Sequence, residues 1–107
     1  MEKLGFVGCG AMGSALIKGI LDSKVFQAEN IICWDTDAQK LAALKKQYNV
    51  ALATHSLQVP EFADTVFLAV KPDDVPRVLA ELNEKITGRH LIVSIAAGVT
   101  LAHMGRC

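Results

Sequence analysis

The sequence has no excess of either charge, few cysteines and no long hydrophobic run. Among 107 residues, 11 Lys and Arg balance 11 Asp and Glu, which argues against a nucleic-acid-binding arm or a polybasic membrane patch. No apolar run approaches the ~20 residues that cross a bilayer, and the start at Met1 lacks the pattern of a secretory leader. We therefore expect a cytoplasmic protein with no membrane or nucleic-acid partner.

The three cysteines lie far apart, at Cys9, Cys33 and Cys107. This spacing fits neither a disulfide framework nor a metal-binding pair, and the three histidines also lack ligand spacing. An apolar content of 51% is too high for a disordered chain, and the length suits one hydrophobic core. We predict one domain without a metal site.

Strand-like and helix-like segments alternate along the chain. Short apolar runs predict five strands, at 4–7, 31–34, 50–53, 65–70 and 91–95. Apolar residues at helical spacing predict helices at 12–21, 38–48 and 73–86, and a short helical turn is predicted at 59–62. Thr36 or Asp37 would cap the helix at 38–48. The alternation predicts an α/β fold, a mostly parallel and doubly wound sheet with helices on both faces.

The turn after the first strand matches the pattern G-x-G-x-x-G over residues 8–13. Gly8 would permit the tight turn, Gly10 would leave room for a pyrophosphate, and Gly13 would let the helix approach the sheet. The N-terminus of that helix presents free N–H groups to an anion. Because the pattern follows a strand and opens a helix, we predict a Rossmann-type nucleotide site rather than a bare turn.

An acidic residue, Asp35, ends the second strand. Its carboxylate can accept hydrogen bonds from ribose hydroxyls and would repel a 2′-phosphate, which favours NAD over NADP. Asp35 could instead cap the next helix, although Asp37 competes for that role. Lys40 could offset the repulsion, which leaves the use of both cofactors open.

The ends of the last two strands should meet at the carboxyl edge of the sheet, where open α/β sheets bind ligands. Lys71 could contact a phosphate or ribose there, or could be a solvated lysine. Ser94 or Ser56 could hydrogen-bond the cofactor. Four small residues would let the backbone pack close to a flat ring: Ala69, Ala96, Ala97 and Gly98.

Three blocks of sequence resemble the signatures of pyrroline-5-carboxylate reductases. The first extends from Gly5 to Gly19, the second from Phe67 to Pro72 and the third from Ser94 to Thr100. They have the spacing of that family, and the resemblance extends over nearly the whole chain up to Thr100. The second and third blocks are more specific than the first, which would also fit hydroxy-acid dehydrogenases.

The resemblance implies an NAD(P)H-dependent oxidoreductase of proline biosynthesis. Such an enzyme passes hydride to the C=N carbon of its small-molecule substrate, 1-pyrroline-5-carboxylate, giving L-proline. The matched positions imply cofactor contacts from Val7, Gly8, Cys9, Gly10, Ala11, Met12, Asp35, Asp37, Ser56, Ala69, Val70, Lys71, Pro72, Ile95, Ala96 and Ala97. The family often has Asn at the positions of Ala11 and Ser56, so this chain has shorter side chains there.

Family members are much longer than this chain. The resemblance therefore implies a cofactor domain at 1–100 with a truncated tail at 101–107, and without the family's C-terminal helical domain. That domain forms the homo-oligomer and holds the substrate carboxylate and the proton donors, so we assign no catalytic residue and expect the chain alone to be inactive. Two alternatives are a stand-alone dinucleotide-binding module without turnover, and another reductase or dehydrogenase of the superfamily acting on a hydroxy acid or a deazaflavin.

Overall fold

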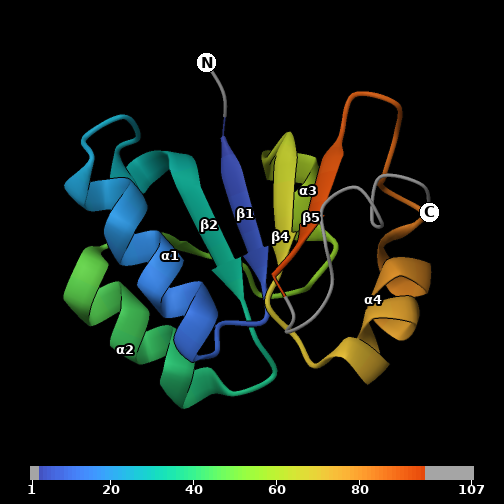
Figure 1. Cartoon of the computed structure of the whole chain (residues 1–107), viewed down its shortest axis with the longest axis horizontal. Helices are drawn as coiled ribbons and strands as arrows, with labels where there is room; N and C mark the ends of the chain where they lie inside the picture. Colours follow the sequence, from blue (N-terminus) through green and yellow to red (C-terminus); the bar gives the residue numbers. More distant parts are fainter. Residues whose placement is uncertain (1–2, 96–107) are drawn as a thin grey trace.

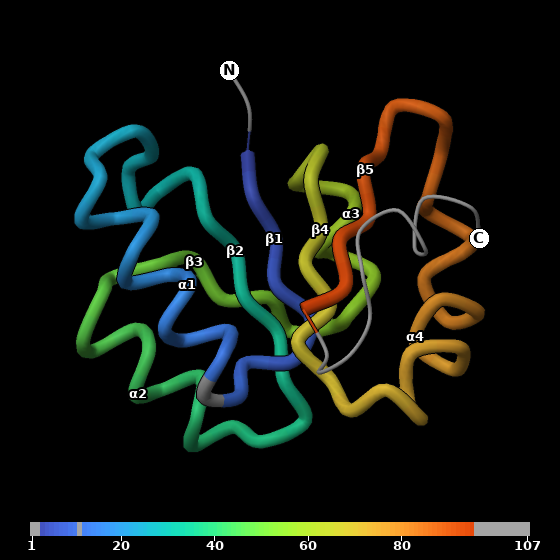
Figure 2. The backbone as a smooth tube through the Cα atoms, in the orientation of Figure 1, coloured from blue at the N-terminus to red at the C-terminus, as the bar shows by residue number. Residues whose placement is uncertain are grey.

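Five strands form one parallel sheet in the computed structural model, which describes residues 3–95 apart from the side chain of Ala11. The order across the sheet is β3-β2-β1-β4-β5, and each neighbouring pair is parallel. The strands are β1 (Leu4–Val7), β2 (Ile31–Trp34), β3 (Ala51–Leu52), β4 (Thr65–Leu68) and β5 (Leu91–Ser94). β1 lies at the centre, and β3 forms the edge beyond β2 (Figure 2). The predicted Rossmann-type α/β fold is thus confirmed.

Helices cover both faces of this sheet (Figure 1). On one face lie α1 (Ala11–Asp22) and α2 (Ala38–Tyr48); on the other lie α3 (Gln58–Phe62) and α4 (Val75–Leu82). Two short 3₁₀ helices, η1 (Ala28–Asn30) and η2 (Pro72–Asp74), precede β2 and α4. Ile17 and Leu44 anchor α1 and α2 in one core cluster. The second cluster holds Val59 of α3 and Val75, Val78 and Leu82 of α4.

β1 is buried along its whole length because both of its faces carry helices. Phe6 points towards α1 and stacks on Phe67 of β4, with ring centroids 4.8 Å apart. Gly5 faces α3, and a Cβ atom there would lie 2.4 Å from Cγ1 of Val59. α3 therefore packs directly on the backbone of β1, which only a glycine permits at this distance.

Local side chains determine where α2 begins and ends. Asp37 is its N-cap, and Oδ1 of Asp37 accepts a 2.9 Å hydrogen bond from the backbone N–H of Gln39. The helix ends at Asn49, whose φ of 60° is left-handed and whose N–H donates to the carbonyl of Lys45. Of the two caps that the sequence suggested, Asp37 is thus the one used.

Four predicted elements are shorter in the structure, and one of them, the strand predicted at 91–95, ends at Ser94. The third strand is Ala51–Leu52, and the fourth ends at Leu68 because the chain turns away after the N–H of Ala69 donates to the carbonyl of Val7. The helix expected at 73–86 is divided into η2 and α4, and α4 ends at Leu82. Ile86 packs on the core from the turn that follows α4. Because it is apolar and at helical spacing, the predicted helix was extended beyond its true end.

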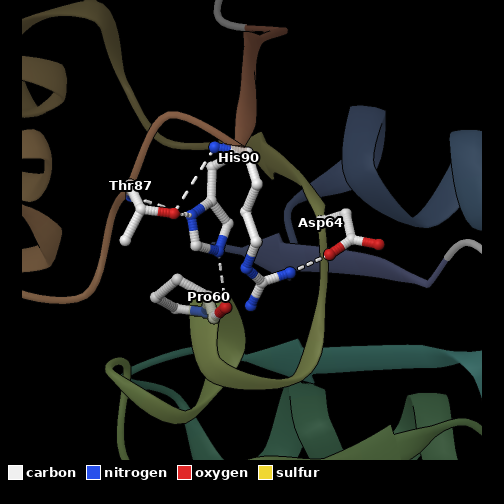
Figure 3. A network of polar contacts seen from close by, with 5 residues as sticks. Pro60, Asp64, Thr87 and His90 are labelled. Carbon is white, nitrogen blue, oxygen red and sulfur yellow. Dashed lines mark hydrogen bonds and ion pairs between the residues drawn. The ribbon is translucent and has the colours of Figure 1, made fainter.

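Polar groups close the amino edge of the sheet, where the strands begin (Figure 3). Arg89 pairs with Asp64, just before β4. His90, just before β5, accepts a 2.9 Å hydrogen bond from the N–H of Thr87 at Nδ1 and donates through Nε2 to the carbonyl of Pro60 at 2.7 Å. These contacts tie the loop before β5 to α3 and to the start of β4.

Within residues 3–95, none of the helices has the length and apolar character that crossing a bilayer requires. The predicted tail at 101–107 lies outside the described residues.

Candidate functional site

A cavity of about 520 Å³ opens at the carboxyl edge of the sheet, which is within the size range of small-molecule sites. The end of β1, the end of β2, the segment after β4 and one face of α4 line it. It includes seven of the predicted cofactor residues: Val7, Gly8, Gly10, Asp35, Ala69, Val70 and Lys71. Residues predicted at the ends of three strands thus line one cavity, whereas the end of β5, which was also predicted to contribute, is not among its lining residues.

The three glycines of the turn have different surroundings. Gly8 has a φ of 85°, and a Cβ atom there would lie 2.7 Å from the carbonyl oxygen of Ala69. At Gly13 a Cβ atom would lie 3.0 Å from Cβ of Ala69, so α1 approaches the segment after β4 closely. At Gly10 a Cβ atom would lie 4.0 Å from its nearest neighbour, the carbonyl oxygen of Ala69. Gly8 and Gly13 are therefore needed for packing, whereas Gly10 borders open space.

α1 begins at this open position. Gly10 is its N-cap, and no side chain caps the helix. The first N–H groups of an α-helix lack partners within the helix, and the helix dipole adds partial positive charge there. The sequence thus places an uncapped helix N-terminus beside a cavity, which suits an anionic group such as a phosphate.

The carboxylate of Asp35 joins the glycine turn to the end of β2. Its Oδ2 accepts a 2.7 Å hydrogen bond from the N–H of Cys9, and its Oδ1 accepts one of 2.8 Å from the N–H of Asp37. The N–H of Gly8 donates to the carbonyl of Trp34 beside it. Asp35 therefore shapes the turn, and each of its oxygens keeps a second lone pair for a ligand. The helix cap itself is Asp37, whose side chain bonds Gln39.

Ser56 lies behind the cavity wall rather than on it. Its side chain is 2% exposed, and its Oγ donates a 2.8 Å hydrogen bond to Oε1 of Glu81 on α4. Glu81 itself lines the cavity. The structure thus shows that the polar group reaching the cavity from this side is Glu81, held in place by Ser56.

The remaining predicted residues are spread around the site. Cys9 is 3% exposed, and its Sγ donates to the carbonyl of Trp34 at 3.6 Å. Met12 is exposed on α1, and Pro72 begins η2. The N–H of Ile95 donates to the carbonyl of Leu68, extending the pairing of β4 and β5. The side chain of Ala11 and all of Ala96 and Ala97 lie outside what the structure describes.

The thiol of Cys9 is buried beside a second free thiol, that of Cys33. A hydrogen bond with Cys33 raises the pKa of Cys9 well above its ordinary value, and burial and the negative charge of Asp35 raise it further. The shift favours the neutral thiol form of Cys9 behind the turn.

Sequence reasoning missed one wall of the cavity. α4 and the residue before it contribute four lining residues at helical spacing: Asp74, Arg77, Val78 and Glu81. This i, i+3, i+4, i+7 pattern lies on one face of a helix. The pattern was visible in the sequence, but its polar members gave no sign that the face borders a site. Trp34, Thr36 and Lys40 complete the lining from β2 and α2.

The charges on the cavity wall balance. Asp35, Asp74 and Glu81 face Lys40, Lys71 and Arg77. Arg77 lies 3.7 Å from Oδ1 of Asp74 and 3.6 Å from Oε2 of Glu81. Among the residues described, no three His, Cys, Asp or Glu side chains come together as a metal site.

Known proteins match this chain over almost all of its length. Residues 3–98 match the family described as NADP oxidoreductase coenzyme F420-dependent. The pyrroline-5-carboxylate reductase of Escherichia coli (strain K12) is 38% identical over 105 residues, which are 98% of this chain and 39% of that protein. The chain thus spans about two-fifths of the length of this curated relative.

Solved structures agree with the sequence match. A pyrroline-5-carboxylate reductase from Coxiella burnetii superposes with a TM-score of 0.85 at 26% identity, over 98% of this chain and 39% of that one. The Plasmodium falciparum pyrroline carboxylate reductase with NADP bound gives a TM-score of 0.79 at 28% identity, over 98% of this chain and 37% of that one. The chain therefore belongs to the NADP oxidoreductase family that these residues match, and it is an N-terminal domain of the pyrroline-5-carboxylate reductase type.

Proposed function

We propose that the chain binds NAD(P)H in the carboxyl-edge cavity and forms the cofactor half of a pyrroline-5-carboxylate reductase. The observation that carries the proposal is the space in front of Gly10, at the uncapped N-terminus of α1. Gly8 and Gly13 are enclosed by other atoms, whereas Gly10 lines the cavity at a position where packing does not require a glycine. A pyrophosphate needs that space and those N–H groups.

Each of the predicted residues that line the cavity would contact a different part of the cofactor. Gly8, Gly10 and the first turn of α1 would hold the pyrophosphate, and Asp35 would accept hydrogen bonds from ribose through its remaining lone pairs. Ala69 and Val70 would form an apolar wall for a ring, with Lys71 beside a phosphate or ribose. When bound, the cofactor supplies the hydride for reduction of an imine carbon.

The proposal is tested by titrating the chain with NADH and NADPH and following binding by calorimetry. Gly10→Val should weaken binding by about a hundredfold or more, because its isopropyl group fills the space of the pyrophosphate. Gly19→Val is the matched control: it lies in the same helix, and a Cβ atom there has nothing within 4 Å. Unchanged affinity in Gly10→Val, with circular dichroism showing a folded chain, would refute the site.

We infer that reduction of 1-pyrroline-5-carboxylate needs residues other than those that the structure describes. Lys71, Asp74 and Arg77 are polar groups near the strand ends, but a reacting imine must also be held in near-attack geometry with a proton supplied to its nitrogen. We propose that a second, helical domain of a longer protein provides these groups and the contacts of a homo-oligomer. A spectrophotometric assay of the purified chain should show no turnover, and turnover near the ~10 s⁻¹ of an ordinary enzyme would contradict this.

A further inference from the structure

We propose that Glu81 determines which of the two nicotinamide cofactors the chain prefers, by holding Arg77 away from a 2′-phosphate. This inference rests on the proposed function and assigns a role to the α4 wall. Glu81 lines the same cavity as the glycine turn, although the two lie far apart in the sequence. Asp35 and the α4 residues line the same cavity, so a dinucleotide with its pyrophosphate at Gly10 and its ribose at Asp35 would bring its adenosine end near α4.

The orientation of Glu81 is set by a buried partner. Ser56 is 2% exposed, and its hydroxyl has Oε1 of Glu81 as its acceptor at 2.8 Å. A buried hydroxyl that lost this acceptor would incur a desolvation cost. The carboxylate is therefore anchored at one oxygen, while its other oxygen, Oε2, faces Arg77 at 3.6 Å.

Arg77 is the cation that this arrangement restrains. Its guanidinium lies between Asp74, the N-cap of α4, and Glu81, about one turn from each, and 66% of its side chain is exposed. Exposed pairs of this kind are weak, so Arg77 can turn to a stronger partner when one of its carboxylates is removed. A phosphate is such a partner, because guanidinium binds phosphate through two hydrogen bonds.

The charge on Glu81 thus acts twice against a 2′-phosphate. It neutralises Arg77, and together with Asp35 and Asp74 it keeps the wall from becoming positive. Removing this one charge leaves Arg77, Lys40 and Lys71 facing two carboxylates. NADPH then gains affinity relative to NADH, which carries no 2′-phosphate.

The test is the ratio of the dissociation constants of NADH and NADPH, measured by calorimetry on the 107-residue chain. Glu81→Gln keeps the size of the side chain and the oxygen that accepts from Ser56. We expect it to shift the ratio towards NADPH by about fivefold at low salt, with less shift at high salt. Glu84→Gln is the matched control, because Glu84 is exposed in the turn just after α4 and is not among the residues that line the cavity. It should keep the wild-type ratio.

A double variant, Glu81→Gln with Arg77→Gln, tests the route through Arg77. It should return the ratio close to that of the wild type. An unchanged ratio in Glu81→Gln, or a shift that persists in the double variant, would overturn the inference while leaving cofactor binding itself intact. Failure of the wild-type chain to bind either cofactor would instead overturn the proposed function and this inference with it.

Discussion

The two edges of the sheet use polar groups in opposite ways. At the amino edge, Asp64 pairs with Arg89, and both ring nitrogens of His90 bond the backbone (Figure 3). At the carboxyl edge, Asp35 accepts two backbone hydrogen bonds but still lines an open cavity. The amino edge is closed by contacts within the chain, whereas the carboxyl edge keeps space and unused hydrogen-bonding capacity. Under the proposed function, stability and binding would therefore depend on opposite edges of one small sheet.

The largest effect that we predict comes from the packed glycine of the carboxyl edge. Gly8→Ala should lower the free energy of unfolding by about 2–4 kcal/mol, because it combines a left-handed backbone with a Cβ atom too close to Ala69. Urea denaturation measures this. Gly10→Ala is the control. It should lower the free energy of unfolding by less than about 1 kcal/mol, because Gly10 is an N-cap residue with open space around it. Equal losses in the two variants would remove the distinction between the packing glycine and the binding glycine.

A substitution at the amino edge should lower the free energy of unfolding without weakening the binding of NADH. His90→Ala leaves the N–H of Thr87 and the carbonyl of Pro60 without this partner, at a cost of about 1–2 kcal/mol. His55→Ala is matched to it: His55 is exposed, and its ring accepts a local hydrogen bond from the N–H of Leu57. The control should change the free energy of unfolding little, and both variants should bind NADH as the wild type does. Weakened NADH binding in His90→Ala would show that the two edges are coupled.

The smallest effect concerns pH and the thiol behind the glycine turn. The pKa of Cys9 is raised in the folded chain by Cys33 and by burial, whereas in the unfolded chain it returns to 9.0. Above that pH the unfolded state binds fewer protons than the folded state, so alkali destabilises the fold. Between pH 8.5 and 10 this group should contribute a loss of about 1 kcal/mol. In Cys9→Ala the urea midpoint should therefore fall less steeply over this range, and identical slopes would contradict the assigned pKa shift.

The arrangement of the fold followed from local patterns in the sequence. Apolar runs predicted the five strands that residues 3–95 form, helical spacing predicted the helices, and Asp37 was one of two predicted caps. The strand predicted at 65–70 was too long because Val70 is apolar for another reason: it packs over the glycine turn, with its Cγ1 2.6 Å from where a Cβ of Gly8 would be. Apolarity alone does not separate a strand residue from one that packs over a turn.

The details of the site depended on contacts between distant residues. Ser56 was predicted to reach the cofactor, but its hydroxyl donates to Glu81, and that pairing requires α4 to lie near the turn that precedes α3. Asp35 bonds the N–H of Cys9 across the gap between β1 and β2. Local spacing predicted which strand ends meet, because parallel strands share an edge, but it could not predict which side chains bond each other there.

The most direct test of the account is a heteronuclear NMR titration of the chain with NADH. The account predicts that perturbed backbone amides cluster at the carboxyl edge, around Gly8, Gly10, Asp35 and Lys71, while those of Asp64 and His90 at the amino edge stay unchanged. Perturbations centred on the amino edge, or none in either region at saturating NADH, would contradict it.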